Sequence, residues 1–150
     1  MKTDILVLSL GSPLLVGVYQ EGLLVQTLQS TDKSSEALPR IMKELLATFT
    51  CTGLYFARGP GSFMAIKVTY LFLKTLELAL DIPLKACDGF AFNDNGPIKA
   101  VGKLFFIKEH GKITTKVLEE ESASTFTLPL VLNTDVFSLD TQPLYHLPAL

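Results

Sequence analysis

A glycine–proline turn between two apolar segments is the feature that most limits how this chain can fold. Residues 57–63 read Ala-Arg-Gly-Pro-Gly-Ser-Phe, with a short apolar run before them (Leu54–Ala57) and a long, nearly all-apolar stretch after them (Met64–Leu80). The short run has the length of a strand and the long one that of a helix, and two glycines allow a sharp turn between them. Another short apolar run follows at Leu84–Cys87. The pattern predicts a strand–helix–strand crossover, which joins parallel strands.

The sequence before this crossover predicts three antiparallel strands and a helix. Strand-like runs occupy Asp4–Leu10, Leu14–Tyr19 and Leu23–Ser30, and only three residues separate each run from the next. Such short turns join antiparallel neighbours. A helix is expected from Ser35 to Phe49, capped by Ser34 or Ser35, because apolar residues recur there at intervals of three and four.

The second helix, expected from Phe63 to Leu80, is unusually apolar. Its polar side chains recur at spacings of 3, 4, 3 and 4, at Lys67, Tyr70, Lys74, Glu77 and Asp81. They predict that one narrow stripe faces water. The remaining faces of this helix need covering by the sheet and by a further helix or a partner.

After residue 90 the pattern is weaker. Strands are expected at Ile98–Val101, Lys103–Ile107 and Ile113–Leu118, with a hairpin turn at Glu109-His110-Gly111. A short apolar run follows at Leu128–Leu132, and residues 135–150 show no helical period, so they are expected to form a tail that builds little of the fold. We therefore divide the chain into an N-terminal unit, residues 1–90, and a reduced β-rich remnant with a tail, residues 91–150.

Composition excludes several classes of protein. The chain has 150 residues, of which 48% are hydrophobic, so it can build one ordinary core. Its net charge is −2 and it has no block of basic residues, so it is not expected to bind nucleic acid unaided. Cys51 and Cys87 form no CxxC motif and are expected to be buried or half-buried thiols. His110 and His146 are isolated from each other, and no metal site is predicted.

Two apolar segments resemble membrane signals, but each contains residues that argue against that interpretation. Asp4 precedes Ile5–Val18, and Gly11-Ser12-Pro13 interrupts it. The stretch Phe63–Leu80 includes three charged side chains that would be costly in lipid, Lys67, Lys74 and Glu77. We expect a cytoplasmic protein that does not associate with a membrane.

The glycine turn is not a Walker phosphate loop, because no Lys-Ser or Lys-Thr pair follows its second glycine and the next basic residue is Lys67. Two interpretations stay open on spacing alone. The turn could be an ordinary strand-to-helix connection, or its free backbone N–H groups could bind an anion or a partner carbonyl.

The string Arg58-Gly59-Pro60-Gly61-Ser62-Phe63, together with Ile82-Pro83-Leu84, resembles the signature of the TsaB family, also called YeaZ. The family string typically continues with Thr-Gly-hydrophobic-Arg, where this chain has Met64-Ala65-Ile66-Lys67. The resemblance covers about residues 1–90. It implies an actin-like (ASKHA, ribonuclease H-like) α/β fold with a reduced second subdomain.

The resemblance also implies a function. The chain would be a non-catalytic scaffold subunit of the complex that forms N6-threonylcarbamoyladenosine in tRNA, binding and activating a TsaD-type threonylcarbamoyltransferase alongside a TsaE-type ATPase. It would form a homodimer when alone and contact tRNA only through the complex. It would need no cofactor of its own, since ATP or ADP and a metal would be held by the partner or at the interface.

The residues that the resemblance assigns fall into two sets. Nucleotide or partner contact is expected at the signature loop Arg58–Phe63 and at Lys67. A partner interface is expected on the two helices, at Met42, Leu46, Tyr70, Leu73, Lys74 and Glu77. The chain departs from the family at Ser9-Leu10-Gly11-Ser12, where an Asp-Thr pair is common, and at Lys33-Ser34-Ser35, where a histidine is common. Lys67 keeps the charge of the usual arginine without its bidentate fork.

Other functions stay open at this point. One is a small actin-like nucleotide-binding enzyme, although none of its aspartates lies in a motif that would hold magnesium: Asp4, Asp32, Asp81, Asp88 and Asp94. A peptidase would need a metal-ligand pair or a Ser-His-Asp arrangement that the sequence does not suggest. The third is an α/β interaction module unrelated to tRNA modification, in which the glycine turn is only a turn.

Overall fold

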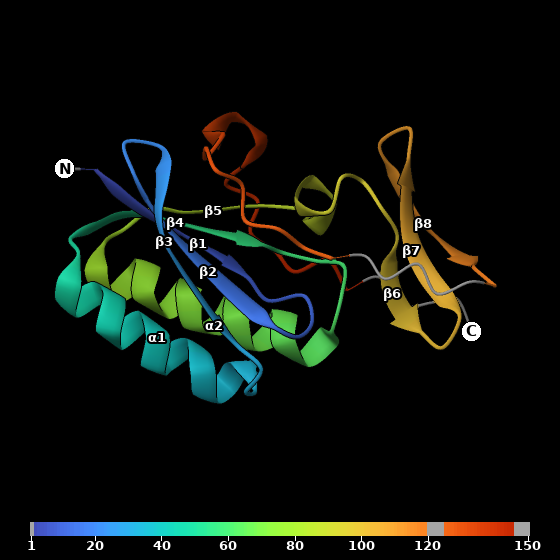
Figure 1. Cartoon of the computed structure of the whole chain (residues 1–150), viewed down its shortest axis with the longest axis horizontal. Helices are drawn as coiled ribbons and strands as arrows, with labels where there is room; N and C mark the ends of the chain where they lie inside the picture. Colours follow the sequence, from blue (N-terminus) through green and yellow to red (C-terminus); the bar gives the residue numbers. More distant parts are fainter. Residues whose placement is uncertain (1, 120–124, 146–150) are drawn as a thin grey trace.

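The computed structural model describes residues 2–119 and 125–145, and these form two β-sheets and two α-helices. Figure 1 shows a larger sheet with both helices on one side, and a smaller sheet at one end of the molecule.

The larger sheet has five strands in the order β3-β2-β1-β4-β5. These strands are β1 (Thr3–Leu8), β2 (Leu14–Gln20), β3 (Leu23–Ser30), β4 (Cys51–Ala57) and β5 (Leu84–Cys87). Strands β1, β2 and β3 are antiparallel, whereas β1, β4 and β5 are parallel. The predicted meander and crossover are both confirmed.

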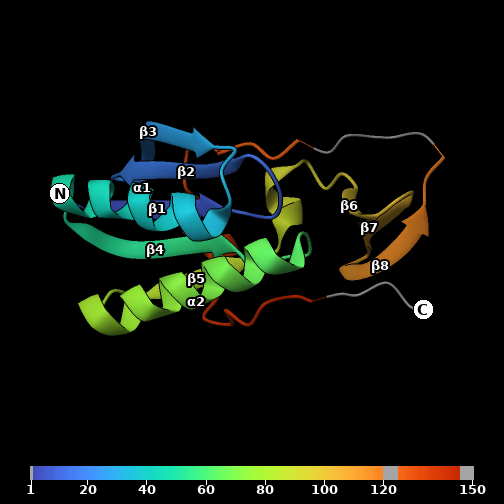
Figure 2. The same ribbon diagram turned by 90° about the horizontal axis from the view of Figure 1, so that it is seen from below.

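Helices α1 (Ser34–Thr48) and α2 (Phe63–Leu80) cover one face of this sheet, as Figure 2 shows. Both belong to one apolar core, in which Leu38 and Met42 of α1 and Leu73 of α2 pack with residues of the sheet such as Ile5 and Val7. The helices form because their apolar positions recur with the helical period and so gather on the side that meets the sheet.

The predicted serine cap of α1 is wrong. The N-cap residue is Lys33, which makes no side-chain capping bond. Ser34 is unavailable for this role because it lies inside the helix and its Oγ is 2.7 Å from Oγ of the buried Ser9.

The smaller sheet is antiparallel and consists of β6 (Ile98–Val101), β7 (Leu104–Glu109) and β8 (Lys112–Val117). A single turn of 3-10 helix, η1 (Gly89–Phe92), precedes it. His110 and Gly111 connect β7 to β8 with φ of 52° and 77°, which is the geometry of a tight hairpin turn. This confirms the predicted hairpin, and His110 is exposed on it. His146 lies outside the described residues.

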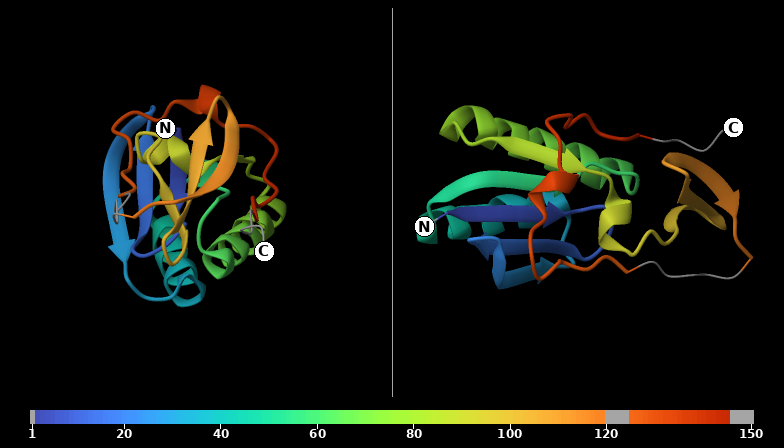
Figure 3. Two further views of the ribbon diagram at one scale, coloured as in Figure 1. Left: turned by 90° about the vertical axis from the view of Figure 1, so that its right-hand side faces the viewer. Right: turned by 90° about the horizontal axis from the view of Figure 1, so that it is seen from above.

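Residues 125–145, which we call the strap, cross the face of the larger sheet opposite the helices and then pass the β5 edge to lie beside α2 (Figure 3). Leu128, Leu132 and Phe137 of the strap are buried in a second apolar cluster with side chains of the sheet. Tyr19 donates a hydrogen bond of 2.7 Å from its hydroxyl to the carbonyl of Pro129. Phe137 and Ser138 belong to the segment expected to form a tail, and they pack on the sheet and pair with Ala86. The strap contains only one short 3-10 turn, η2 (Thr134–Val136), and irregular chain gives no periodic signal.

The strap also pairs with both edges of the five-stranded sheet. At the β3 edge, Leu24 N donates to Leu130 O at 3.0 Å. At the β5 edge, Ala86 and Ser138 exchange two backbone hydrogen bonds of 2.9 and 2.8 Å. Pairing of this kind occupies edge groups that would otherwise be available to another strand.

Two further predictions concern single residue types and membrane association. Cys51 is buried and Cys87 half-buried, both as free thiols, which confirms the expected state of the two cysteines. Within the described ranges, no helix is both long enough and apolar enough to cross a membrane.

Candidate functional site

The signature loop, Arg58–Phe63, connects the end of β4 to the start of α2 and ties several elements together. Arg58 N donates to Cys87 O at 2.9 Å, Gly89 N donates to Gly59 O at 2.9 Å, and Ser62 N donates to Leu10 O at 2.8 Å. The loop thus joins the carboxyl ends of β1, β4 and β5. Because the Ser62 N–H is already bonded to the chain, it is not free to bind an anion.

Close packing explains both glycines of the loop. A Cβ at Gly61 would lie 2.5 Å from the carbonyl oxygen of Leu10. Gly59 has φ of +126°, and a Cβ there would lie 2.8 Å from the carbonyl oxygen of Leu144. Glycine is required at both positions because backbone from another segment approaches too closely for a side chain.

Arg58 is bound by the strap rather than directed to open solvent. Its Nη1 donates to the carbonyl of Gln142 at 2.8 Å, and its Nη2 lies 3.7 Å from Oδ2 of Asp140. Only 20% of the Arg58 side chain is exposed. No pattern in the sequence indicates these partners, which are more than 80 residues away.

The end of the loop begins α2. Ser62 is the N-cap residue, and its Oγ accepts a hydrogen bond of 3.5 Å from Ala65 N. Phe63 and Lys67 are exposed in the first turns of the helix, and the ring of Phe63 lies 4.6 Å from that of Tyr145. The loop therefore presents an aromatic ring and a cation at its surface, and the strap lies against the ring.

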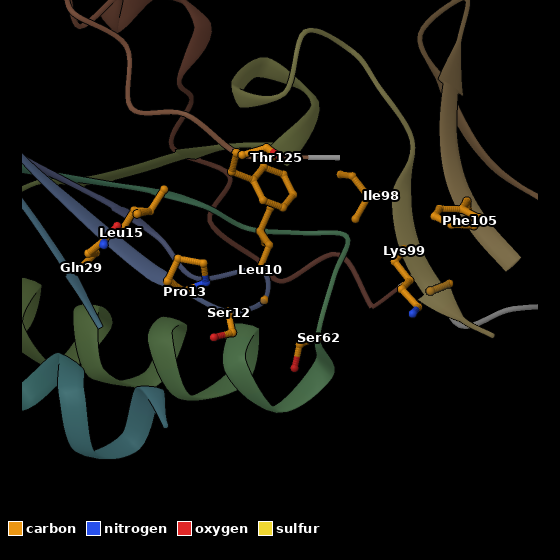
Figure 4. A pocket seen from close by; sticks show the side chains of 13 residues that line it. Leu10, Ser12, Pro13, Leu15, Gln29, Ser62, Ile98, Lys99, Phe105 and Thr125 are labelled. Atoms are coloured by element: carbon orange, nitrogen blue, oxygen red, sulfur yellow. The ribbon is translucent and has the colours of Figure 1, made fainter. Parts of the chain in front are cut away.

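Two cavities border the signature loop, and both are lined by Gly11, Ser12 and Ser62. The first, of about 710 Å³, lies between the β1–β2 turn and the smaller sheet (Figure 4). Among the described residues its walls are mostly apolar, and the polar side chains of that part of the lining are Ser12, Gln29, Ser62, Lys99 and Thr125. This composition suits a largely apolar group with a few hydrogen-bonding atoms better than a chain of phosphates.

The second cavity, of about 690 Å³, lies between the β1–β2 turn, the β3–α1 connection and the first turns of α2. Five hydroxyl side chains line it, from Ser12, Thr31, Ser34, Ser35 and Ser62. Asp32, which also lines it, lies 3.3 Å from the guanidinium of Arg40. The cavity can offer hydrogen bonds, and the two segments that depart from the family pattern, at Ser12 and at Ser34-Ser35, both line it.

The other aspartates lie in separate places with local roles. Asp88 accepts a hydrogen bond of 3.0 Å from Phe90 N and pairs with Lys108, and Asp81 ends α2 with φ of 53°. Asp94 is exposed in a turn. Asp4 is buried on β1, and its Oδ1 has no hydrogen-bond partner. Among residues 2–119 and 125–145, no group of three or more His, Cys, Asp or Glu side chains could hold a metal ion.

Burial sets the ionisation of the thiols and of Asp4. Burial, followed by the charge of Asp88, raises the pKa of Cys87 to about 12, and burial raises that of Cys51 to about 11. Neither thiol is therefore suited to act as a nucleophile at neutral pH. Burial is also the main reason why the pKa of the Asp4 carboxyl lies above its ordinary value.

The stripe predicted to face water on α2 is confirmed at its two ends, where Lys67 and Asp81 are exposed, and is wrong between them. Its members Tyr70, Lys74 and Glu77 are half-buried. Glu77 is held by contacts from both sides, because its Oε2 accepts from Leu84 N at 2.9 Å and its Oε1 lies 2.7 Å from Lys74 Nζ. Glu77 therefore faces β5, while 40% of the Lys74 side chain stays exposed.

Large apolar side chains lie exposed on α2, alongside the exposed Lys67 and Thr75. Met64, Leu71 and Leu78 have exposed fractions of 62%, 53% and 76% and follow one another at intervals of seven residues. We call these three residues the α2 stripe. The sequence does not single out these three positions, because nearly all other positions of the helix are apolar as well.

Two residues assigned to a partner interface are inaccessible. Met42 and Leu73 are completely buried in the first apolar core, so their assignment to a surface is corrected. Leu46 and Tyr70 are half-buried against that core, and the Tyr70 ring lies 6.4 Å from that of Phe56. A helical period marks which positions are apolar but not which of them the rest of the fold covers.

No protein-family model and no curated protein matches the sequence. Solved structures do match the fold. One is YeaZ from Pseudomonas aeruginosa, with a TM-score of 0.63 and 17% identity over 83% of this chain and 70% of that one. Another is described as an uncharacterized protein with similarity to peptidase YEAZ from Pseudomonas aeruginosa, with a TM-score of 0.62, 18% identity and the same coverage. The likeness confirms the predicted actin-like α/β fold.

Proposed function

We propose that this chain is a TsaB-like, non-catalytic scaffold subunit that binds a TsaD-type threonylcarbamoyltransferase through α2. The observation that carries the proposal is the α2 stripe, an exposed apolar surface on the helix that the signature loop begins. The YeaZ-like fold and the Arg58–Phe63 string support the same assignment.

The stripe has the geometry of a helix-packing surface. Residues seven positions apart lie on one side of a helix, so Met64, Leu71 and Leu78 form a single narrow seam. Burial of each large apolar side chain is worth about 1.5–3 kcal/mol relative to full exposure. Three such side chains at the centre of an interface would supply a large share of a stable association.

In this proposal the TsaD-type partner carries the chemistry, together with any metal and nucleotide. This chain supports the partner's structure, a TsaE-type ATPase acts with both, and tRNA is contacted only through the complex. When no partner is present, the same stripe would bind a second copy of the chain.

The test is reconstitution of threonylcarbamoyladenosine formation with TsaC-, TsaD- and TsaE-type proteins, with and without this chain. We expect product only when the chain is present. Leu71→Glu should abolish both co-elution with the TsaD-type protein and product formation. Thr114→Glu, which places the same charge on the exposed face of β8, is the matched control and should preserve both.

Two results would overturn the proposal. One is product at an undiminished rate when the chain is omitted. The other is unchanged co-elution of the Leu71→Glu variant, provided that its circular dichroism spectrum shows it to be folded. Sedimentation of the chain alone, expected to be dimeric and to become monomeric in Leu71→Glu, reports the homodimer separately.

A second candidate is a small nucleotide-binding enzyme, which is favoured by the two cavities at the carboxyl ends of β1 and β4. Calorimetric titration of the isolated chain with ATP and magnesium distinguishes it from the scaffold. Micromolar binding that is lost in Ser12→Leu would favour the enzyme. If neither ATP binding nor a TsaD-type partner is found, the unrelated interaction module is the function that remains.

A further inference from the structure

The last part of the strap lies on the surface that the sequence assigned to nucleotide or partner contact. Leu144 N donates to Arg58 O at 2.8 Å, and the Arg58 guanidinium binds the Gln142 carbonyl. Gln142 Nε2 also lies 3.4 Å from the Tyr70 hydroxyl, and the rings of Tyr145 and Phe63 are in contact. Residues 139–145 therefore cover Arg58, Phe63 and Tyr70 within the chain itself.

The two halves of the strap are held very differently. Up to Ser138 the strap is fixed by buried apolar side chains and by the paired backbone hydrogen bonds to Ala86. Beyond Ser138, four residues are exposed, Pro143 and Leu144 are half-buried, and Thr141 is buried; the exposed ones are Leu139, Asp140, Gln142 and Tyr145. Side-chain pairs at exposed positions contribute little because water competes for them.

We propose that residues 139–145 form a displaceable latch, which opens locally while the rest of the strap stays in place. Local opening of this kind is expected where few apolar contacts are buried and most hydrogen bonds lie near solvent. Opening frees the Arg58 guanidinium, the Phe63 ring and the edge of Tyr70 for another molecule. Arg58 is thus kept occupied at rest and becomes available to a carboxylate or phosphate when the latch opens.

Two strap amides provide a matched comparison by NMR hydrogen exchange on the full chain. Leu144 N–H and Ser138 N–H each donate a backbone hydrogen bond of 2.8 Å, the first in the latch and the second in the fixed part. We expect the Leu144 amide to exchange at least about 100-fold faster than the Ser138 amide. If the two amides exchange within a factor of about two, the strap opens only as a whole and the proposal fails.

A charge reversal tests the link between the latch and Arg58. Asp140→Lys removes the carboxylate beside Arg58 and should speed exchange of the Leu144 amide several-fold without changing that of Ser138. Asp135→Lys, at an exposed position in the fixed part of the strap, is the control and should change neither. An unchanged Leu144 exchange rate in Asp140→Lys would overturn the role of this contact.

Release of Arg58 can be read directly, because the chain has two arginines and the other, Arg40, is exposed and far from the latch in sequence. Phenylglyoxal should modify Arg58 more slowly than Arg40 in the unaltered chain, and the two rates should become similar in Asp140→Lys. Equal rates in the unaltered chain would overturn the proposal. These measurements use the chain alone, so their outcome does not depend on whether the proposed scaffold function is correct.

Discussion

The contribution of the strap to stability can be tested at Phe137. Its side chain is 8% exposed, and its ring meets that of Tyr55 edge-to-face at a centroid distance of 4.8 Å. Replacing a buried phenylalanine by alanine costs about 3–5 kcal/mol in a rigid core. Because the strap is irregular and can move partly into the space left behind, we expect Phe137→Ala to cost about 3 kcal/mol, the lower end of that range.

Leu139→Ala is the matched control, since Leu139 lies two residues further along the strap and is 76% exposed. It should change the free energy of unfolding by less than about 0.5 kcal/mol. Urea denaturation followed by circular dichroism measures both variants. With a slope of about 2 kcal/mol per molar urea, Phe137→Ala should lower the midpoint by about 1.5 M. A loss below about 1 kcal/mol would show that the strap only rests on the sheet, and would refute the reasoning.

Three further predictions follow from single sites. The raised pKa of Asp4 means that its contribution to stability is present below the unfolded-state pKa, near 3.8, and is lost as pH rises through the folded-state value. Asp4→Asn removes the charge and should therefore lose less stability than the unaltered chain when urea denaturation is compared between pH 3 and pH 7; an equal loss in both chains would contradict this. Gly61→Ala should lower the free energy of unfolding by about 1–3 kcal/mol, because the added Cβ would meet the Leu10 carbonyl. A Cβ added at Gly11 would meet no atom within 4 Å, so Gly11→Ala is the control and should leave thermal unfolding nearly unchanged. Iodoacetamide at pH 8 should label Cys51 and Cys87 about 100-fold or more slowly in the folded chain than in urea, because burial raises both thiol pKa values; equal rates would rule out this account.

The sequence predicted the elements whose signal is local. The three-residue turns set the antiparallel order of β1, β2 and β3, and the glycine turn followed by an apolar helix set the parallel crossover from β4 to β5. The hairpin at His110-Gly111 was also predicted, because a two-residue turn requires particular backbone conformations. In each case the information lies within a few neighbouring residues.

The candidate site was predicted less completely. The sequence located the signature loop, but the reason for its glycines is the approach of Leu10 and Leu144, which are distant in the chain. The spacing of apolar residues alone could not show that Leu73 is buried and that Leu71, two residues away on the same helix, is exposed. That difference depends on which neighbouring elements cover each side of α2.

By itself, then, the sequence determined the order of helices and strands and the direction in which they join, because turn length and apolar period act over short distances. The tertiary structure alone decided that an irregular strap crosses the open face of the sheet, that Arg58 binds this strap, and that Met64, Leu71 and Leu78 stay exposed on α2. Contacts such as Arg58–Gln142, 84 residues apart, arise only when the whole chain has folded, and irregular segments have no period from which to predict them.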